Sequence, residues 1–349
     1  MTSWPERSGI ASALASAVLF GTATPAAKAF LGVISPLVLA GLFYLGSGFV
    51  LSLWAVARRV VTKQHEGPRL QGADLGWLGL AAFCGGVAGP VLLFSGLAAT
   101  PASTSSLLLN LEGVLTALLA CLVFGEHLDR RLLAGMAAIL AGCVVLGWRG
   151  GPVAGAAGIG ALAVAGACLA WAIDNNVTRK ISGGDAVLVG AVKGAAAGSV
   201  TLGLGLASGA AFPGPGVVAA AVLVGVLGYG LSLVLFVRAL RDLGAARAAA
   251  YFSVAPFTGA LLSVSVLGEP VTGALLAGGC LVGLGVWLHL TEDHGHEHEH
   301  PEAVHVHWHR HDPHHGHGHG GEDHAHPHHH PLTVHSHPHY PDLHHRHGH

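Results

Sequence analysis

The stretch ALLACLVFGEHLDRRLLAG at residues 117–135 returns as ALLSVSVLGEPVTGALLAG at residues 260–278. An offset of 143 residues aligns the opening Ala-Leu-Leu, the central Gly-Glu pair and the closing Leu-Leu-Ala-Gly of the two copies. Each copy predicts an apolar helix, a break at Gly-Glu and a second apolar helix. Sequence similarity at a fixed offset is typical of a structural unit that occurs more than once. The chain is therefore predicted to contain two copies of one helical unit.

The composition indicates the solvent of this unit. Only 10% of the 349 residues are charged, whereas 52% are hydrophobic and 52 residues are glycine. Soluble domains contain about 25% charged residues, and their helices carry Lys, Glu and Arg along the exposed face. Runs of 18 or more apolar residues predict transmembrane helices. The chain is therefore predicted to be an all-α membrane protein, which excludes a large soluble enzyme rich in Ala and Gly.

The hydrophobic runs predict ten transmembrane helices, joined in several places by very short connections. Short connections imply antiparallel neighbours. We expect a first five-helix repeat in residues 1–150, a second in residues 151–290 and a tail in residues 291–349. The ten predicted helices cover residues 9–31, 35–57, 73–96, 102–124, 131–148, 156–177, 185–208, 215–238, 245–267 and 271–290.

The placement of Lys and Arg predicts the orientation, because cytoplasmic loops carry an excess of both residues. With the N-terminus in the cytoplasm, only Arg149 falls on the opposite side, so both termini are expected to be cytoplasmic. Five helices per half is an odd number, which makes the two halves inverted repeats. Inverted repeats with a site between them are a recurring plan among transporters. We expect a multi-pass protein of a bacterial-type inner (plasma) membrane.

Three motifs carry a resemblance to a known family. They are LEGVLTALLACLVFGE at 111–126, LAWAIDNNVTRKIS at 169–182 and YFSVAPFTGALLSVSVLGE at 251–269. Each five-helix unit resembles the EamA domain, and two in tandem over residues 10–290 resemble the drug/metabolite transporter superfamily. The resemblance implies a secondary transporter without specifying its substrate. One position departs from the family pattern, since the first repeat has Gly113 where the second has Pro256.

Glu112 is the leading candidate for the substrate site. It lies near the middle of its predicted helix, where a charged side chain costs about 2.5–3.5 kcal/mol on insertion scales. Such a carboxylate should face the bundle interior or a wet cavity and bind substrate or a proton. The alternative is a carboxylate that packs helices together and pairs with Lys28 or Lys193.

Other polar residues are weaker candidates for substrate binding. Lys193 lies about nine residues inside its predicted helix and is a candidate counter-charge for Glu112. Lys28 can instead extend to the membrane surface, and Asn110 points elsewhere than Glu112 on the helix. Asp174 and Asn175 are expected at the cytoplasmic mouth, where capping of a helix end is the alternative role.

Glycine, proline and two further glutamates predict breaks in the helices. Gly85-Gly86 and Gly89-Pro90 should break the third helix, and Gly225, Gly228 and Gly230 should loosen the eighth. Close packing through small residues is the alternative role for these glycines. Glu126 and Glu269 are expected to fix the Gly-Glu break between helices rather than to bind substrate.

The tail has a different composition. Of the 27 histidines, 24 lie between His294 and His349, and aliphatic residues are almost absent. Such a segment cannot bury a core, so it is predicted to be disordered. Neighbouring imidazoles suit divalent Zn, Ni or Co, and a pH-responsive role is the alternative. A purification tag is disfavoured, because the longest histidine run is three residues. The predicted metal ligands are His294, His296, His298, His300, His315, His317 and His319.

The function predicted from these features is a secondary-active transporter that exports a small metabolite and is coupled to an ion gradient. Two alternatives remain, a divalent metal ion (Ni, Co or Zn) transporter and a membrane-anchored metal buffer or sensor. The five cysteines lie in apolar runs without a CxxC motif, and no phosphate loop or nucleophile elbow occurs, so no enzyme is expected. The expected partners are lipid, a small-molecule substrate and divalent metal ions; no required cofactor and no nucleic acid are expected, and a homodimer is left open.

Overall fold

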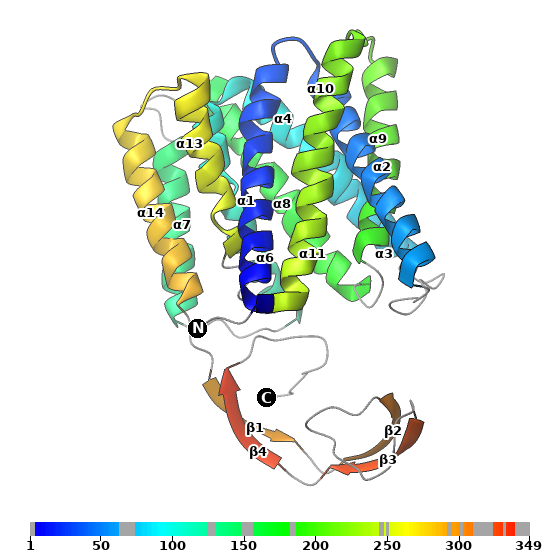
Figure 1. Ribbon diagram of the computed structural model, residues 1–349. Coiled ribbons are helices and arrows are strands. Elements are labelled where there is room, and N and C mark those ends of the chain that lie inside the picture. The colour runs from blue at the N-terminus through cyan, green and yellow to red at the C-terminus, as the bar shows by residue number, and fades with distance from the viewer. Residues whose placement is uncertain are drawn as a thin grey trace. The chain divides into compact units, whose positions relative to one another are not determined.

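The computed structural model describes residues 4–62, 74–124, 130–147, 156–181, 186–243, 248, 251–291, 295–300, 303–309, 324–330 and 333–338. It divides into two units, Met1–Thr291 and Glu292–His349, which are described separately. The described part of the first unit is a helical bundle (Figure 1). Its helices are α1 (Trp4–Phe30), α2 (Pro36–Thr62), α3 (Asp74–Ala81), η1 (Ala82–Ala88), α4 (Gly89–Ala99), α5 (Ala102–Leu108), α6 (Leu111–Phe124), α7 (Arg130–Gly147), α8 (Ala156–Ile181), α9 (Ala186–Ala207), α10 (Pro215–Gly225), η2 (Val226–Leu231), α11 (Ser232–Leu243), α13 (Ala255–Leu267) and α14 (Gly273–Leu290).

Seven helical segments of the described chain are long and apolar enough to cross a membrane. Two shorter apolar helices, Ala255–Leu267 and Gly273–His289, follow them. Many large apolar side chains lie on the outside of the bundle, including Leu122 and Phe49, which are 80% and 69% exposed. Lipid is the solvent that such a surface fits, because apolar area exposed to water is unfavourable. The bundle is therefore a multi-pass membrane protein, while the count of ten transmembrane helices stays a prediction.

Both predicted glycine-rich breaks are confirmed as π-helical segments. η1 interrupts the third span between α3 and α4, and η2 interrupts a later span between α10 and α11. The offset of 143 residues carries residues 82–88 onto 225–231, so the two irregularities recur in register. In η1, Gly89 donates its N–H to the carbonyl of Cys84, five residues back. Pro90 has no N–H to continue this pattern, which leaves the Gly85 carbonyl without the next helical donor.

Close packing through small residues also occurs, so both roles considered for the glycines hold. A Cβ on Gly225 would collide with the backbone of Phe43, and one on Gly194 would lie 2.8 Å from the Cα of Gly48. Side chains larger than hydrogen at these positions would push α2 away from α10 and α9. Small residues at membrane helix interfaces allow this close backbone approach.

The helix contacts of one half of the chain have counterparts in the other half. α1 packs against α11 and α13, and α8 correspondingly packs against α4 and α6. Helices at matching places in the two halves pair with each other, as α2 does with α9 and α7 with α14. Figure 1 shows that α1 begins and α14 ends at the same end of the bundle. These features fit two related halves, and the inverted orientation of the halves stays a prediction.

The corner between α4 and α5 is held by two charged side chains from other helices. Glu269 accepts hydrogen bonds from the backbone N–H groups of Ala102 (2.6 Å) and Ser103 (2.9 Å) and from the Ser103 hydroxyl (2.5 Å). Lys28 donates to the carbonyl of Leu97 at 2.5 Å, at the C-terminal end of α4. A carboxylate at a helix N-terminus and an ammonium at a C-terminus both complement the helix dipole. Glu269 therefore stabilises the corner between α4 and α5, while its expected role at the Gly268-Glu269 break stays a prediction and Glu126 lies outside the described residues.

The described part of the tail consists of four short strands, a difference from the predicted disorder. They are β1 (Gly295–His300), β2 (Ala303–His309), β3 (His324–His330) and β4 (Thr333–Pro338). β1 pairs with β4 and β2 with β3, both antiparallel. Disorder is predicted because the tail has too few apolar residues for a hydrophobic core. Backbone pairing in a ladder requires no apolar side chains, so strands can still form. Of the predicted metal ligands, His296, His298 and His300 lie on β1; His294, His315, His317 and His319 lie outside the described residues.

Candidate substrate pocket

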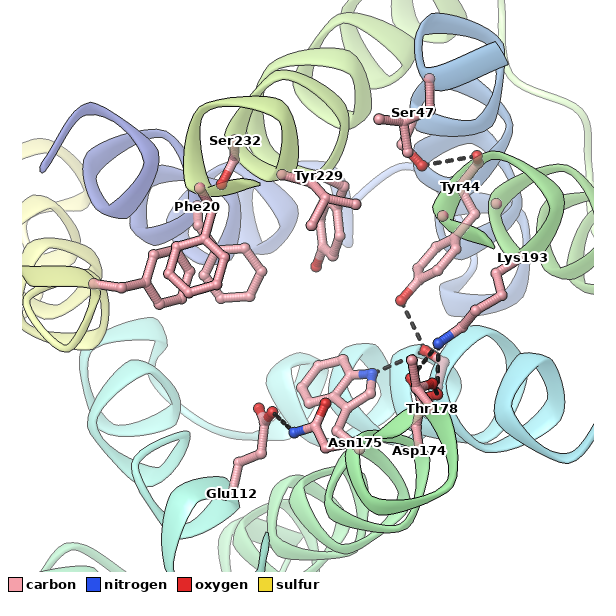
Figure 2. A pocket seen from close by; sticks show the side chains of 18 residues that line it. Phe20, Tyr44, Ser47, Glu112, Asp174, Asn175, Thr178, Lys193, Tyr229 and Ser232 are labelled. Atoms are coloured by element: carbon pink, nitrogen blue, oxygen red, sulfur yellow. Dashed lines mark hydrogen bonds and ion pairs between the residues drawn. The ribbon is translucent and has the colours of Figure 1, made fainter. Parts of the chain in front are cut away.

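A pocket with a volume of about 370 Å³ lies inside the helical unit. Figure 2 shows side chains converging on it from helices of both halves of the chain. The first half contributes α1, α2, η1 and α6, and the second half contributes α8, α9, η2, α11 and the residues before α13. Its lining is formed by Phe20, Tyr44, Ser47, Leu51, Gly85, Glu112, Trp171, Asp174, Asn175, Thr178, Gly190, Lys193, Gly194, Tyr229, Ser232, Leu233, Phe236 and Phe252.

An ion pair between α8 and α9 forms one side of the pocket. Nζ of Lys193 lies 2.5 Å from Oδ1 and 2.6 Å from Oδ2 of Asp174. The hydroxyl of Thr178, one turn further along α8, donates to Oδ1 of Asp174 at 2.9 Å. The side chains of Lys193 and Asp174 are only 16% and 11% exposed. Because desolvated charges are stable only when they are paired and hydrogen-bonded, the carboxylate and the ammonium neutralise each other here.

Glu112 lines another side of the pocket, near the start of α6. Its Oε1 accepts a hydrogen bond of 2.8 Å from Nδ2 of Asn175 on α8. Among the residues that the structure describes, Glu112 forms no ion pair. Figure 2 shows the carboxyl group directed into the pocket, with Asn175 between it and the Asp174 pair. An amide donor stabilises a carboxylate less than a cation does, so Glu112 has no matching cation among the residues that the structure describes.

A backbone carbonyl in the π-helical segment fixes two aromatic side chains of the pocket. The Gly85 carbonyl accepts hydrogen bonds from the Tyr44 hydroxyl (2.8 Å) and from Nε1 of Trp171 (2.9 Å). This carbonyl is available because Pro90 lacks an N–H. The absence of a side chain at Gly85 also leaves room for Asp174, since a Cβ there would collide with the Asp174 carboxylate. The break in the third span therefore shapes the pocket directly.

Aromatic rings form the wall opposite Glu112. The ring centroid of Phe20 lies 5.6 Å from that of Tyr229 and 5.5 Å from that of Phe252. Phe252 in turn lies 4.8 Å from Phe236, and Tyr229 lies 5.5 Å from Tyr44. Ring pairs at these separations stabilise each other. The wall is therefore a continuous aromatic surface built by α1, α2, η2 and α11 together with Phe252.

The sequence pattern of the EamA-like transporter family matches this chain twice, over residues 7–148 and again over residues 158–291. The chain belongs to the EamA-like transporter family. The two matches cover the helices that line the pocket, and membership indicates a membrane transporter rather than an enzyme. This EamA-like protein contacts lipid through the large apolar side chains on the outside of the bundle and is expected to transport a small molecule.

One curated protein and one solved structure are similar to this chain. A protein of Methanothermobacter thermautotrophicus named as an uncharacterized transporter is 27% identical over 274 residues, which cover 75% of this chain and 80% of that protein. A solved structure described only as a crystal structure of protein has a TM-score of 0.59 and 22% sequence identity. It covers 81% of this chain and 96% of its own. At that identity the second likeness shows a shared fold alone.

The predicted substrate residues of this EamA-like transporter fall into two groups. Glu112, Asp174, Asn175 and Lys193 all line the pocket, although they come from α6, α8 and α9. Asn110 and Lys28 do not line it. Nδ2 of Asn110 donates to the carbonyl of Leu107 on its own segment, and Lys28 caps α4. Substrate binding by each of the six residues stays a prediction.

One predicted pairing is wrong. Lys193 was expected to be the counter-charge of Glu112, but the structure pairs it with Asp174. The physical reason is geometric, because Asp174 lies on the stretch of α8 that faces Lys193 on α9, while Asn175, one residue along, is rotated toward α6. Asp174, which the sequence analysis expects at the cytoplasmic mouth, therefore forms the ion pair with Lys193.

Sequence reasoning missed the rest of the lining, yet a signal for it exists. On α8 the lining residues Trp171, Asp174, Asn175 and Thr178 have the spacing i, i+3, i+4 and i+7, which is one face of a helix. Tyr229, Ser232, Leu233 and Phe236 repeat the same spacing across η2 and α11. Polar and aromatic residues at this period within apolar helices indicate a face turned away from lipid.

The described residues hold no group of three or more His, Cys, Asp or Glu side chains that could bind a metal ion. The pocket in particular offers two carboxylates, one of which is already paired with Lys193. Transport of a divalent metal through the bundle therefore has no ligand set in the described part of the chain, and metal binding by the tail stays a prediction.

Proposed function

We propose that this protein is a secondary-active transporter that exports a small metabolite, with the pocket between its two halves as the substrate site. The observation that carries the proposal is the lining itself, in which both halves contribute side chains and Glu112 has no cationic partner in the described chain. A site between two repeats can face either side of the membrane when the halves rock against each other. The matching helix contacts of the two halves support this alternating access.

The two π-helical segments are the proposed hinges of that movement. Each interrupts a span that lines the pocket, η1 at Gly85 and η2 at Tyr229. Local breaks of this kind are tolerated in a membrane where protein groups or cavity water satisfy the freed backbone. At Gly85 the protein groups are Tyr44 and Trp171. A change in these hydrogen bonds would couple the bend of the third span to the shape of the pocket.

Glu112 is the proposed coupling residue. A carboxylate inside a membrane bundle marks a substrate or proton pathway in many transporters. Since the Asp174–Lys193 pair is already neutral, Glu112 is the group in the lining that can exchange a proton for substrate. Transport would then respond to a proton gradient.

The test uses proteoliposomes that contain the full-length protein and a panel of small cationic, neutral and anionic metabolites. We expect flux of at least one compound to rise with an imposed pH gradient and to fall strongly in Glu112→Gln. Asp242→Asn is the matched control, because Asp242 forms a surface pair with Arg238 at 3.8 Å and does not line the pocket. Unchanged flux in Glu112→Gln removes Glu112 from the mechanism, and no flux for any compound argues against a transporter of small metabolites.

A second role is proposed for the tail, namely binding of divalent Zn, Ni or Co. The support for this role is composition, because 24 of the 27 histidines lie between His294 and His349 and imidazole is a suitable ligand for these divalent ions. The test compares the nickel, cobalt and zinc contents of cells with the full-length protein, cells without it and cells with a form cut after Glu292. The comparison tests whether the tail buffers the metal or supplies it for transport.

A further inference from the structure

The charges of the pocket favour one class of ligand. Glu112 and Asp174 are the lining carboxylates, and Lys193 is the lining cation. Because Lys193 contacts both oxygens of Asp174, this pair contributes no net charge. Ionised Glu112 therefore gives the part of the lining that the structure describes a net charge of minus one. A mobile positive charge is the partner that restores neutrality in a site with little water.

The hydrogen-bond donors of the lining are mostly occupied by the protein. Tyr44 donates to the Gly85 carbonyl, and Ser47 donates to the Tyr44 carbonyl at 3.0 Å. Ser232 donates to the Ser16 carbonyl at 3.1 Å, and Thr178 donates to Asp174. A carboxylate, a phosphate or a sugar would need several free donors to replace its hydration. The lining therefore disfavours anions and polyols.

The aromatic wall suits a cation with an apolar body. Phe20, Tyr229, Phe236 and Phe252 line the pocket as a series of ring contacts between 4.8 and 5.6 Å. Figure 2 shows Phe20 and Tyr229 on the side of the pocket opposite Glu112 and Asn175. The negative face of an aromatic ring attracts ammonium groups, and the ring also stabilises apolar carbon. The carboxylate and the rings line the same pocket, and an alkylammonium or arylalkylammonium ion would fit between them.

We propose that the pocket selects a small organic monocation, whose ammonium group lies between Glu112 and the aromatic wall and whose apolar body packs on Phe20, Tyr229 and Phe252. The inference rests on the transporter proposed above, and names the substrate class of that site. A volume of about 370 Å³ is at the lower end of small-molecule sites, which span roughly 300–1,000 Å³. The ligand is therefore a compact amine rather than a polyamine or a large lipophilic drug.

The test compares ligands that share one apolar body and differ in charge. Isothermal titration calorimetry of the full-length protein in detergent micelles uses 2-phenylethylammonium, 2-phenylethanol and phenylacetate, with tetraethylammonium as a second cation. We expect binding of a cation, and affinity at least about tenfold weaker for the alcohol and the anion. Because this selectivity is measured on the unaltered protein, it does not depend on the folding of any variant.

Variants then locate the site. Glu112→Gln and Phe252→Leu should each weaken binding of the cation, by about tenfold for the first. Phe49→Leu, which changes a phenylalanine that is 69% exposed on the outside of the bundle, is the control for the second and should leave binding unchanged. Asp242→Asn is again the control for the first.

The outcomes separate this inference from the proposed function. Binding of neither cation, or equal binding of cation, alcohol and anion, overturns the substrate class. Cation binding that depends on Glu112, but without flux in proteoliposomes, supports the cation site and counts against the transporter. Flux of neutral or anionic metabolites by a protein that binds no cation supports the transporter and overturns the cation site.

Discussion

Substitution of Gly85 by alanine tests how closely the π-helical break and the ion pair depend on each other. A Cβ at residue 85 would collide with the carboxyl group of Asp174 and lie 3.0 Å from its Cβ. The carboxylate cannot move aside freely, because it is held by Lys193 at 2.5 and 2.6 Å and by Thr178 at 2.9 Å. The substitution must therefore displace either η1 from α8 or Asp174 from Lys193.

The two responses have different costs. Displacement of the backbone corresponds to overpacking, which destabilises by about 1–3 kcal/mol. Separation of the ion pair leaves a buried charge without its partner, which costs about 3–5 kcal/mol in other proteins. We expect Gly85→Ala to lower the free energy of unfolding by at least ~1 kcal/mol and to reduce flux, because both responses distort the pocket.

Gly79 supplies the matched control within the same span. No atom lies within 4 Å of a Cβ built on Gly79, so Gly79→Ala meets open space. It should be neutral or stabilise by up to ~1 kcal/mol, the difference in helix propensity between the two residues. Unfolding titrations of both variants in mixed detergent micelles, followed by circular dichroism, measure the difference. If Gly85→Ala unfolds at the same point as Gly79→Ala and retains flux, the close approach of η1 to Asp174 has no energetic weight, and the account of the pocket is wrong.

Three further predictions address the ion pair, the helix corner and the tail. Asp174→Asn and Lys193→Met should each destabilise the protein by about 3–5 kcal/mol, while the double variant should lose less than the sum in unfolding titrations; strict additivity would show that the pair does not couple. Glu269→Gln should lower the free energy of unfolding by about 1–2 kcal/mol through loss of its charged hydrogen bonds to α5. Thr272→Ala, which removes the side-chain cap of α14, is the comparison, and an effect of Glu269→Gln below that of Thr272→Ala would contradict the cap. In equilibrium dialysis, the full-length protein should bind several nickel ions at pH 7.5 and few at pH 5.5, because protonated imidazoles cannot ligate metal; a form that ends at Thr291 should bind almost none at either pH, and equal binding by the two forms would place the metal elsewhere.

Much of the fold follows from local sequence features. The repeated stretch indicated a duplicated helical unit, and the low content of charge indicated a membrane as its solvent. The Gly89-Pro90 pair predicted a break in the third span, since proline removes a helical N–H whatever its neighbours are. Glu112 was recognisable as a pocket candidate because a carboxylate in an apolar helix has few stable surroundings.

Contacts between helices could not be predicted from these local sequence features. Lys193 lies close to Asp174 and not to Glu112, a choice that depends on the rotation of α8 and α9 about their axes. The aromatic wall joins residues that are 232 positions apart in the chain, from Phe20 to Phe252. Lys28 was a candidate for the cavity, and the structure instead uses it as a cap for α4.

The amino-acid sequence by itself determined that this protein is a duplicated, helical membrane protein with a histidine-rich tail, because periodicity, charge content and helix-breaking residues act within a few turns of one helix. Only the tertiary structure decided which carboxylate pairs with Lys193 and which aromatic rings line the same pocket. Both outcomes depend on distances of a few ångströms between helices that are remote in the chain, and those distances are set by the packing of the whole bundle.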